Sequence, residues 1–350
     1  FFSQLVHHIE QTRERTQYLF SGVHRKYIYL YFSSAKIQQF VGTTLPVCLV
    51  ARQATFYIKI PPESRFLCKF APCFGGSRPP EAIIIMIRKA VILGTGNVAW
   101  QLAHSLPLFG YCVVQIFGRN AAKAEDLASA VGADHTDSYD EIYPDADIYI
   151  YAVSDDAISE VVASVRLDSG VHVHTSGCVG IDVFEGSKSN YGVVYPFQTF
   201  TRNKKIDFSK LAIFFEANND SSRSRVEEFA KALSLKVFES NSEQRRRVHL
   251  AGVVGCNFAN YLWSISYDIL RQQGYPFRDV MLPLIEESLD KLRYMSPSEA
   301  QTGPARRGDT GTIAAHEALL ADNSDIAAMY RMLSKMIADG SNYKYNRNRQ

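Results

Sequence analysis

The sequence predicts an α/β protein with a doubly wound, mostly parallel sheet, followed by an all-helical C-terminal region. Short apolar runs of strand length alternate with amphipathic helical segments from residue 88 to residue 240. A Gly-x-Gly-x-x-Ala turn joins the first of these runs to the first helical segment. After residue 240 the apolar residues keep a helical spacing, and no strand pattern returns.

The expected strands are short runs rich in Val, Ile and aromatic residues, as is typical of strands buried on both faces. They are expected at 89–93, 112–117, 147–153, 171–174, 192–195, 211–215 and 235–238. Helices are expected between them at 100–108, 121–131, 157–165 and 224–233, with residues 154–156 as the cap of the third. Such alternation favours a parallel sheet with helices on both faces.

The turn after the first strand has the composition of a dinucleotide site. Gly94 allows a tight turn, Gly96 lets a pyrophosphate approach the backbone, and the small Ala99 lets the helix pack close to the strand. The free N–H groups at the start of the helix favour phosphate. Ligands of doubly wound sheets bind at the carboxyl ends of the strands. The expected cofactor-binding residues are Gly94, Thr95, Gly96, Asn97, Val98, Arg119, Asn120, Ala152, Val153 and Ser154.

The end of the second strand indicates which dinucleotide binds. A carboxylate about 20 residues after the glycines would hold the ribose 2′-hydroxyl of NAD. The chain has no acidic residue at 118–120 and carries Arg119 there. An arginine pairs with a 2′-phosphate, whereas a carboxylate would repel it. We therefore expect NADP (NADPH) as the cofactor, with a solvated surface arginine as the alternative interpretation.

The C-terminal region is expected to consist of helices. A long helix is predicted over 243–273, because apolar residues recur at helical spacing and no proline interrupts it. Its arginine run at 245–247 is expected to be a solvated face, with an anion contact as the alternative. Further helices are expected at 278–293, 312–320 and 325–338, with a capping box at 296–299 and a charged loop at 302–309. The long helix has more apolar surface than one partner covers, so we expect a homodimer through this region.

Residues 1–85 differ in composition from the rest of the chain. They contain no Asp or Asn, whereas 86–350 contains all 19 Asp and all 13 Asn. The first methionine, Met86, directly precedes the first expected strand. We expect 1–85 to lie outside the functional fold, as translated upstream DNA; a transit peptide or a genuine extension are the alternatives. The expected domains are then 86–240 for the dinucleotide and 241–340 for substrate and dimerisation, with a polar tail at 341–350.

Overall composition excludes several classes of protein. Hydrophobic residues make up 46% and charged residues 21%, as in ordinary globular proteins. The net charge of +2 gives no reason to expect a nucleic-acid partner. No apolar run reaches the roughly 18 residues of a membrane span, so no membrane partner is expected. Six cysteines without a CxxC pair indicate neither a disulfide framework nor a zinc site. We expect no bound metal and a cytoplasmic protein.

From Met86 onward the sequence resembles a family of Rossmann-like NADP oxidoreductases with a helical second domain of unknown function. The family is often grouped with the deazaflavin-dependent NADP reductases. The shared motifs are Gly94-Thr-Gly-Asn-Val-Ala99, His174-Thr-Ser-Gly177, Tyr195-Pro-Phe197, His249-Leu-Ala-Gly-Val with Asn257-Phe-Ala-Asn260, and Thr302-Gly-Pro-Ala-Arg-Arg-Gly-Asp309 with His316.

The resemblance extends to wider relatives, which include pyrroline-carboxylate reductases, ketopantoate reductases and β-hydroxyacid dehydrogenases. It implies that the helical domain dimerises and closes the active site. β-Hydroxyacid dehydrogenases use a lysine four residues before an asparagine of the long helix. Val253 and Cys256 stand at those places, so that proton transfer is not carried over.

Hydride transfer requires a nearby group that donates or accepts a proton. We predict His174, Ser176 and Asn257 as catalytic residues. His174 and Ser176 follow a strand at its carboxyl end, and Asn257 lies on the long helix, where it shares a face with His249. A loop histidine and serine that satisfy backbone groups are the equally supported alternative. Weaker substrate contacts are predicted for Gly177, His249, Asn260, Arg306 and Asp309. For Arg306 and Asp309 the alternative is that they tie their loop to its own helix ends.

Two functions of different classes fit these features. The first is an NADP-dependent oxidoreductase that transfers a hydride between the nicotinamide and a small polar substrate. The second is a non-catalytic dinucleotide-binding sensor or scaffold, because a nucleotide-binding fold alone does not establish turnover.

Overall fold

The computed structural model describes residues 28–31, 48–52, 55–59, 88–202 and 204–340. The chain forms two compact units, Phe1–Ala251 and Gly252–Gln350, and each is described by itself. The prediction for 1–85 falls mostly outside the described residues. Within that stretch, β1 (Ile28–Tyr31), β2 (Cys48–Arg52) and β3 (Thr55–Lys59) form a separate antiparallel sheet.

The main sheet of the first unit has eight strands in the order β11-β10-β9-β8-β7-β4-β5-β6. Its strands are β4 (Arg88–Leu93), β5 (Tyr111–Phe117), β6 (Asp134–Thr136), β7 (Ile148–Tyr151), β8 (Val171–His174), β9 (Tyr191–Phe197), β10 (Ala212–Ala217) and β11 (Lys236–Glu239). Neighbouring strands are parallel except β9 and β10. The predicted doubly wound, mostly parallel sheet is confirmed. The edge strand β6 was not predicted, because its three residues lack an apolar pattern.

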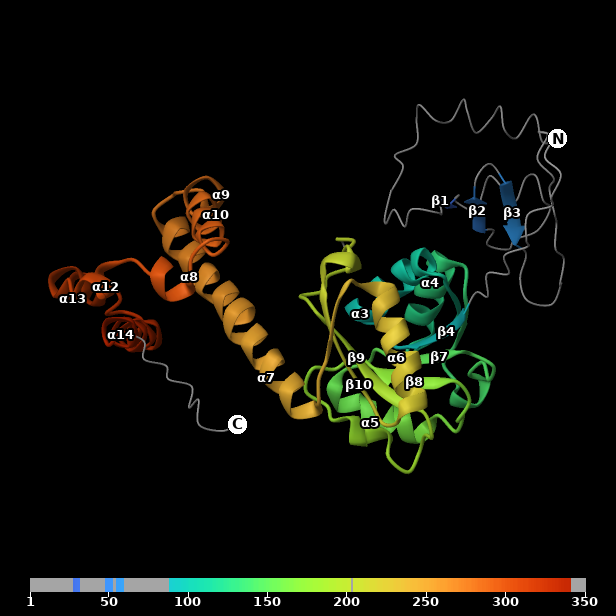
Figure 1. The fold of residues 1–350 in the computed structure, drawn as a ribbon. Coiled ribbons are helices and arrows are strands. Elements are labelled where there is room, and N and C mark those ends of the chain that lie inside the picture. Colours follow the sequence, from blue (N-terminus) through green and yellow to red (C-terminus); the bar gives the residue numbers. More distant parts are fainter. Residues whose placement is uncertain (1–27, 32–47, 53–54, 60–87, 203, 341–350) are drawn as a thin grey trace. The chain divides into compact units, whose positions relative to one another are not determined.

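Helices cover both faces of this sheet (Figure 1). They are α3 (Asn97–Ser105), α4 (Ala121–Val131), α5 (Asp155–Ser164) and α6 (Asp220–Leu233). On β4, Ala90 and Ile92 pack in one buried cluster with α3, α4 and α6. Val91 and Leu93 pack in a second cluster with α5. Successive side chains of a strand point to opposite faces, so the continuous apolar run at 90–93 suits this double burial.

The strand order fixes where a ligand can bind. From β4 the chain runs outward to β5 and β6, then returns to β7 on the other side of β4. The carboxyl ends of β4 and β7 therefore meet at the switch point, where doubly wound sheets hold their ligands. Gly94, with φ 132°, follows β4 there, and a Cβ on it would lie 2.3 Å from the Ala152 carbonyl oxygen. Only glycine fits this crossing.

The second unit consists of helices, as predicted. α7 (Ser242–Gly252) belongs to the first unit except for its last residue, and its helix continues in the second unit as the π-helix η5 (Val253–Phe258) and α8 (Ala259–Gln272). The remaining helices are α9 (Phe277–Val280), α10 (Leu282–Lys291), α11 (Pro297–Ala300), α12 (Pro304–Arg307), α13 (Thr310–Leu319) and α14 (Ser324–Ala338). The predicted capping box is present at Ser296 and Glu299. The predicted helix at 243–273 is helical throughout, but its α-helical spacing is interrupted by η5.

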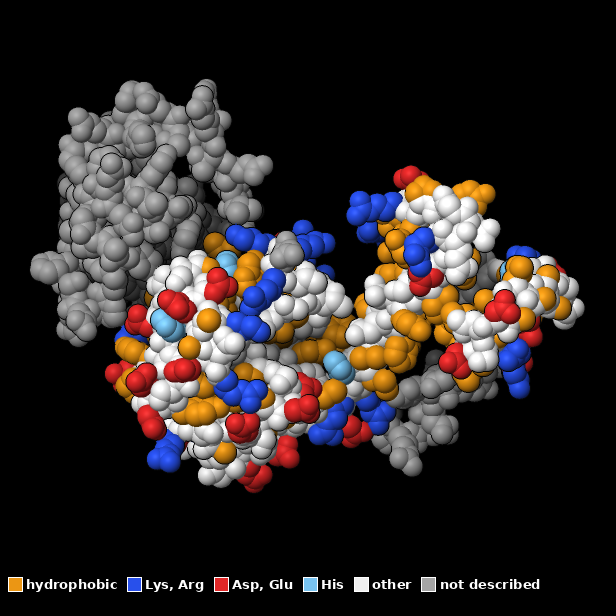
Figure 2. All heavy atoms as spheres, turned by 180° about the vertical axis from the view of Figure 1, so that it is seen from behind, with side chains coloured by type: hydrophobic (Ala, Val, Ile, Leu, Met, Phe, Trp, Pro, Cys, Tyr) orange, Lys and Arg blue, Asp and Glu red, His pale blue; other side chains and the backbone are white. Residues whose placement is uncertain are grey.

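The helical unit leaves most of its apolar side chains exposed, as the orange patches of Figure 2 show. Of the described residues 252–340, only Ala305 and Ala327 are buried. Large exposed residues include Phe258, Tyr261, Tyr275, Leu284, Tyr294, Leu319 and Met332. Among the described residues, no helix has the length and hydropathy that a membrane crossing requires.

Candidate active site

The turn after β4 has the shape that a pyrophosphate needs. Gly96 is the N-cap of α3, and both Gly96 and Asn97 are exposed. A Cβ on Gly96 would meet no atom within 4 Å, so the space above this backbone is open. The first N–H groups of a helix have no partner within the helix and favour an anion. Gly94, Thr95, Gly96, Asn97 and Val98 therefore fit the pyrophosphate of NADP.

A loop between β9 and β10 is hydrogen-bonded to this turn, a contact that no local sequence pattern indicates. Arg202 donates from Nη2 to the Thr95 carbonyl oxygen at 2.6 Å. Asn97 donates from Nδ2 to the Phe200 carbonyl oxygen at 2.9 Å. The buried Gln101 amide bonds the backbone of the same loop. Arg202 thus adds a positive charge beside the open Gly96 backbone.

Arg119 lies after β5 with 62% of its side chain exposed, 3.5 Å from a Glu160 carboxylate oxygen. An exposed pair of this kind contributes little, so the guanidinium is available to a 2′-phosphate. A Cβ on Gly118 would lie 2.6 Å from the Thr95 side chain, which places the end of β5 against the phosphate turn. Asn120 caps α4 by accepting from the Lys123 N–H. Its contact with the cofactor stays a prediction.

The end of β7 forms the neighbouring edge of the same crevice. Ala152 is buried, and its N–H donates to the Leu93 carbonyl oxygen at 2.8 Å. Val153 is half-buried, and Ser154 is exposed at the N-cap of α5. Their position beside β4 is the one predicted, and their contact with a cofactor stays a prediction.

His174 and Ser176 lie at the end of β8 and are both buried. His174 accepts at Nδ1 from the Ser176 N–H at 3.2 Å and donates from Nε2 to the Gly180 carbonyl oxygen at 3.3 Å. Ser176 Oγ accepts from the N–H groups of Cys178 and Val179, both at 3.0 Å. These contacts are those of the alternative interpretation, in which both side chains satisfy backbone groups. Neither ring nitrogen of His174 is left to face a substrate.

Acid should destabilise the fold through His172 and His174. Burial lowers the pKa of each to about 3. Below pH ~6.5 the unfolded chain binds protons at both positions and the folded chain does not. Above this pH the two histidines do not lower the free energy of unfolding. As the pH falls toward 4, each of them lowers it by up to about 1.4 kcal/mol per pH unit. Urea unfolding from pH 7 to 5 measures the slope. His172→Asn should reduce it by one histidine's share, and an unchanged slope would contradict this assignment.

The prediction of a solvated arginine run is wrong for Arg245, whose side chain is 0% exposed. Arg245 pairs with the Glu216 carboxylate and donates to the Val179 carbonyl oxygen at 2.6 Å. Arg246 donates from Nε to the Cys178 carbonyl oxygen at 3.0 Å. The first turns of α7 thereby hold the loop that follows β8. A run of three arginines does not indicate which one points inward.

Tyr195 of β9 and His249 of α7 meet over Gly177 in the same region. Tyr195 Oη lies 3.1 Å from His249 Nδ1. A Cβ on Gly177 would lie 2.8 Å from both Tyr195 Cζ and His249 Nδ1. The structure therefore brings together two predicted substrate contacts, Gly177 and His249. Tyr195 belongs to the Tyr195-Pro-Phe197 motif, but its residue type and position alone do not predict a site residue.

The other predicted residues lie in the helical unit. Asn257, in η5, Asn260, in α8, and Arg306, in α12, are all exposed. Asp309 is the N-cap of α13, where its carboxylate accepts from the N–H and the hydroxyl of Thr312. That contact ties the loop to its own helix, which was the alternative for this residue. A substrate contact for these four residues stays a prediction.

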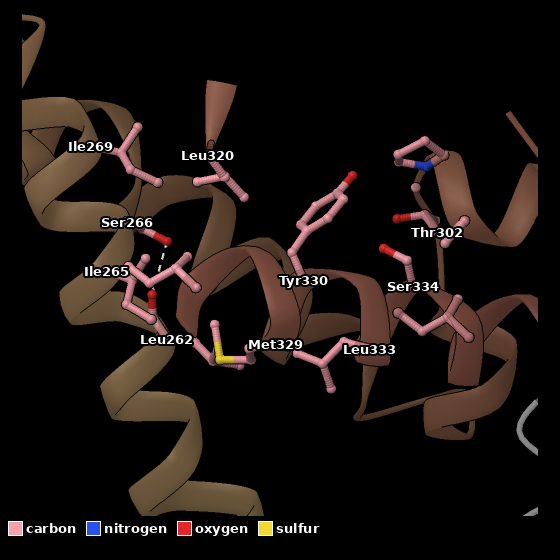
Figure 3. Close-up of a pocket in the computed structure, with 15 residues that line it drawn as sticks. Leu262, Ile265, Ser266, Ile269, Thr302, Leu320, Met329, Tyr330, Leu333 and Ser334 are labelled. Carbon is pink, nitrogen blue, oxygen red and sulfur yellow. Dashed lines mark hydrogen bonds between the residues drawn. The ribbon is translucent and has the colours of Figure 1, made fainter. Parts of the chain in front are cut away.

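The helical unit also contains an apolar groove (Figure 3). Leu262, Ile265 and Ile269 line it from α8, and Met329 and Leu333 line it from α14. The Ser266 hydroxyl in its wall donates to the Leu262 carbonyl oxygen of the same helix, so it is already satisfied. The groove therefore suits apolar side chains better than a polar substrate.

Comparison with known proteins assigns the two parts of the chain. Residues 89–173 match the family model described as NADP oxidoreductase, coenzyme F420-dependent. Residues 211–337 match a domain of unknown function, DUF2520. A proposed NADP oxidoreductase of Bacteroides fragilis is 36% identical over 73% of this chain and 99% of its own, with a TM-score of 0.69. The chain belongs to this NADP oxidoreductase family. It is an NAD(P)-dependent oxidoreductase with NADP as its cofactor.

More distant structures share the fold of this NADP oxidoreductase. A Thermotoga maritima protein is 20% identical over 72% of this chain and 99% of its own, with a TM-score of 0.61. A reductive aminase of Aspergillus terreus is 15% identical over 73% of this chain and 94% of its own, with a TM-score of 0.54. No curated protein matches the sequence.

Proposed function

We propose that the enzyme transfers a hydride between NADP(H) and a small polar substrate that contains a C=O or C=N bond. The observation that carries this proposal is the arrangement of groups along one sheet edge. The open phosphate turn follows β4, and the Tyr195–His249 pair lies beside the loop after β8. A dinucleotide whose pyrophosphate is held at the phosphate turn extends across the strand ends toward the Tyr195–His249 pair.

Different residues would bind different parts of the cofactor and of the substrate. NADP supplies the hydride chemistry when it is bound. The N–H groups of the turn and the Arg202 guanidinium surround the place of the pyrophosphate, and Arg119 is available to the 2′-phosphate. His174 and Arg245 hold the loop after β8 from two sides. We propose that this loop forms the wall of the substrate site.

The test is substrate-dependent oxidation of NADPH over a panel of small carbonyl compounds and imines. The proposal expects turnover above background for a subset of them, with deuterium from C4-deuterated NADPH recovered on the product carbon. Tight NADPH binding without turnover over the whole panel would contradict it and would favour the sensor or scaffold.

NADPH should bind more tightly than NADH, and Arg119→Asp should remove or reverse this preference. A charge-assisted contact with the 2′-phosphate contributes about 1.5–3 kcal/mol, or about tenfold to a hundredfold in affinity. Arg202→Ala is the matched control, since a residue beside the pyrophosphate should weaken both cofactors alike. Titration calorimetry with both cofactors measures the ratio. Equal affinities of the wild-type protein would refute the role of Arg119.

We further propose that the protein is a homodimer through its helical unit. Within 252–340 as described, only two alanines are buried, while Tyr261, Tyr294 and Leu319 are largely exposed. Apolar surface of this extent marks an interaction site. Sedimentation equilibrium at micromolar concentration should give twice the chain mass. A monomeric mass would count against the proposal.

A further inference from the structure

The Tyr195–His249 pair is built from segments 54 residues apart in sequence. Tyr195 Oη and His249 Nδ1 are 3.1 Å apart, and the two ring centroids are 6.1 Å apart. Both side chains are half-buried, so part of each faces solvent. The pair is therefore held in one geometry and is still open to a small molecule.

The backbone at Gly177 is fitted to this pair. A Cβ there would lie 2.8 Å from Tyr195 Cζ and 2.9 Å from His249 Cβ. These distances are shorter than a real Cβ tolerates, so only glycine fits beneath the pair.

The pair lies close to the cofactor crevice. Strands in a sheet are about 4.8 Å apart, so β9 lies about 10 Å from β7, whose end forms the cofactor crevice with β4. Tyr195 is thus within one small molecule's length of the crevice.

Two other polar side chains near the pair, His174 and Ser176, are already bonded. Both ring nitrogens of His174 and the oxygen of Ser176 have backbone partners. The Tyr195 phenol bonds only His249 among the hydrogen bonds of the described residues. The pKa of Tyr195 is raised to about 12, mainly by burial and to a lesser extent by Cys178 and Asp155, while Arg245 opposes the rise. The phenol therefore keeps its proton at neutral pH.

We infer that Tyr195 is the catalytic acid of the hydride transfer and that His249 is the residue that positions and reprotonates it. The inference rests on the proposed function. With a proton on Nδ1, His249 donates to Tyr195 Oη, and the phenol hydrogen is free to face the substrate. His174 and Ser176 are then positioning residues of the loop, and no proton passes through them.

In the reduction, the substrate carbon receives a hydride from the reduced nicotinamide while its oxygen or nitrogen takes the phenol proton. The O–H bond of Tyr195 breaks and leaves its electron pair on the phenol oxygen. His249 then gives its Nδ1 proton to that oxygen while its Nε2 takes a proton from solvent, so the imidazole stays neutral, and proton exchange with water restores its starting tautomer. Oxidation of the product reverses each transfer.

The experiment compares Tyr195→Phe with Tyr191→Phe, which makes the same change on the same strand. With a substrate found for the wild-type enzyme, Tyr195→Phe should lower kcat by about 10²–10⁴-fold while the NADPH affinity changes less than twofold. Tyr191→Phe should keep kcat within about threefold of the wild-type value, because Tyr191 lies away from the Tyr195–His249 pair. Thermal melting of each variant establishes that it is folded.

His249→Gln provides an independent test, which does not require the Tyr195→Phe variant to fold. It should lower kcat and displace the pH profile of kcat, with the NADPH affinity unchanged. The double variant with Tyr195→Phe should be no slower than Tyr195→Phe alone, because the two residues act on one proton. A His249→Gln enzyme with wild-type kcat and pH profile would exclude the relay.

The outcomes separate this inference from the proposed function. Wild-type turnover together with near-full turnover of folded Tyr195→Phe would overturn the role of Tyr195 and leave hydride transfer intact. Absence of turnover in the wild-type protein with every substrate would overturn the proposed function, and the proton-donor role would fall with it.

Discussion

Gly96→Ala should abolish NADPH binding without a loss of thermal stability. Its φ of −76° is accessible to alanine, and the added Cβ meets no protein atom within 4 Å. That same open space is the one a pyrophosphate must enter, so the Cβ would block the cofactor and nothing else. We expect an affinity at least about 100-fold weaker, or about 2.7 kcal/mol. Calorimetric titration and thermal melting of the same sample measure the two properties.

Two other glycine-to-alanine changes are the controls. Gly94→Ala should destabilise the fold itself, because its φ is 132° and its Cβ would lie 2.3 Å from a backbone oxygen. Gly255 lies in η5, where an added Cβ would meet no atom within 4 Å. Gly255→Ala should therefore alter neither the NADPH affinity nor the thermal stability. Wild-type affinity in Gly96→Ala would mean that the dinucleotide does not bind at this turn.

Arg245→Met should destabilise the first unit by about 3–5 kcal/mol, because it leaves a poorly solvated carboxylate without its cation. Glu216 has only 14% of its side chain exposed and pairs with Arg245. The change also removes the guanidinium bond to the Val179 carbonyl oxygen. Urea unfolding at neutral pH measures the free energy of unfolding.

A double variant isolates the cause of that loss. Arg245→Met with Glu216→Gln removes the carboxylate charge and should recover part of the stability. Arg247→Met is the matched control, since its side chain is 57% exposed and it pairs with Glu243 on the surface of α7. That control should change stability by less than about 1 kcal/mol. Equal losses in the two arginine variants would contradict the buried pair.

The main elements of the fold follow from local patterns. The run at 89–93 and the glycine turn after it predicted β4, the phosphate turn and α3 close to their observed bounds. The edge strand β6 was missed because Asp134–Thr136 has no apolar alternation, and it is defined by pairing with β5. The π-helix at Val253–Phe258 was missed because an apolar helical spacing does not distinguish an α-helix from one wider turn.

The candidate site was predictable at the phosphate turn and less so elsewhere. A pyrophosphate site depends on closely spaced glycines, here Gly94 and Gly96, which the sequence displays directly. Tyr195 and His249 meet only through the register of β9 and the placement of α7, which no local pattern encodes. The position of His174 at the carboxyl end of a strand predicts a catalytic role. In the structure both of its ring nitrogens bond the backbone, at Ser176 and Gly180, and no sequence pattern indicates these contacts.

A crystal structure of the NADPH complex tests most directly whether hydride transfer takes place at this sheet edge. We predict the pyrophosphate over the Gly96 backbone and the nicotinamide beyond the ends of β7 and β8, with C4 facing the space beside Gly177 and Tyr195. A nicotinamide that points away from Gly177, or a pyrophosphate bound elsewhere than the turn after β4, would contradict the account.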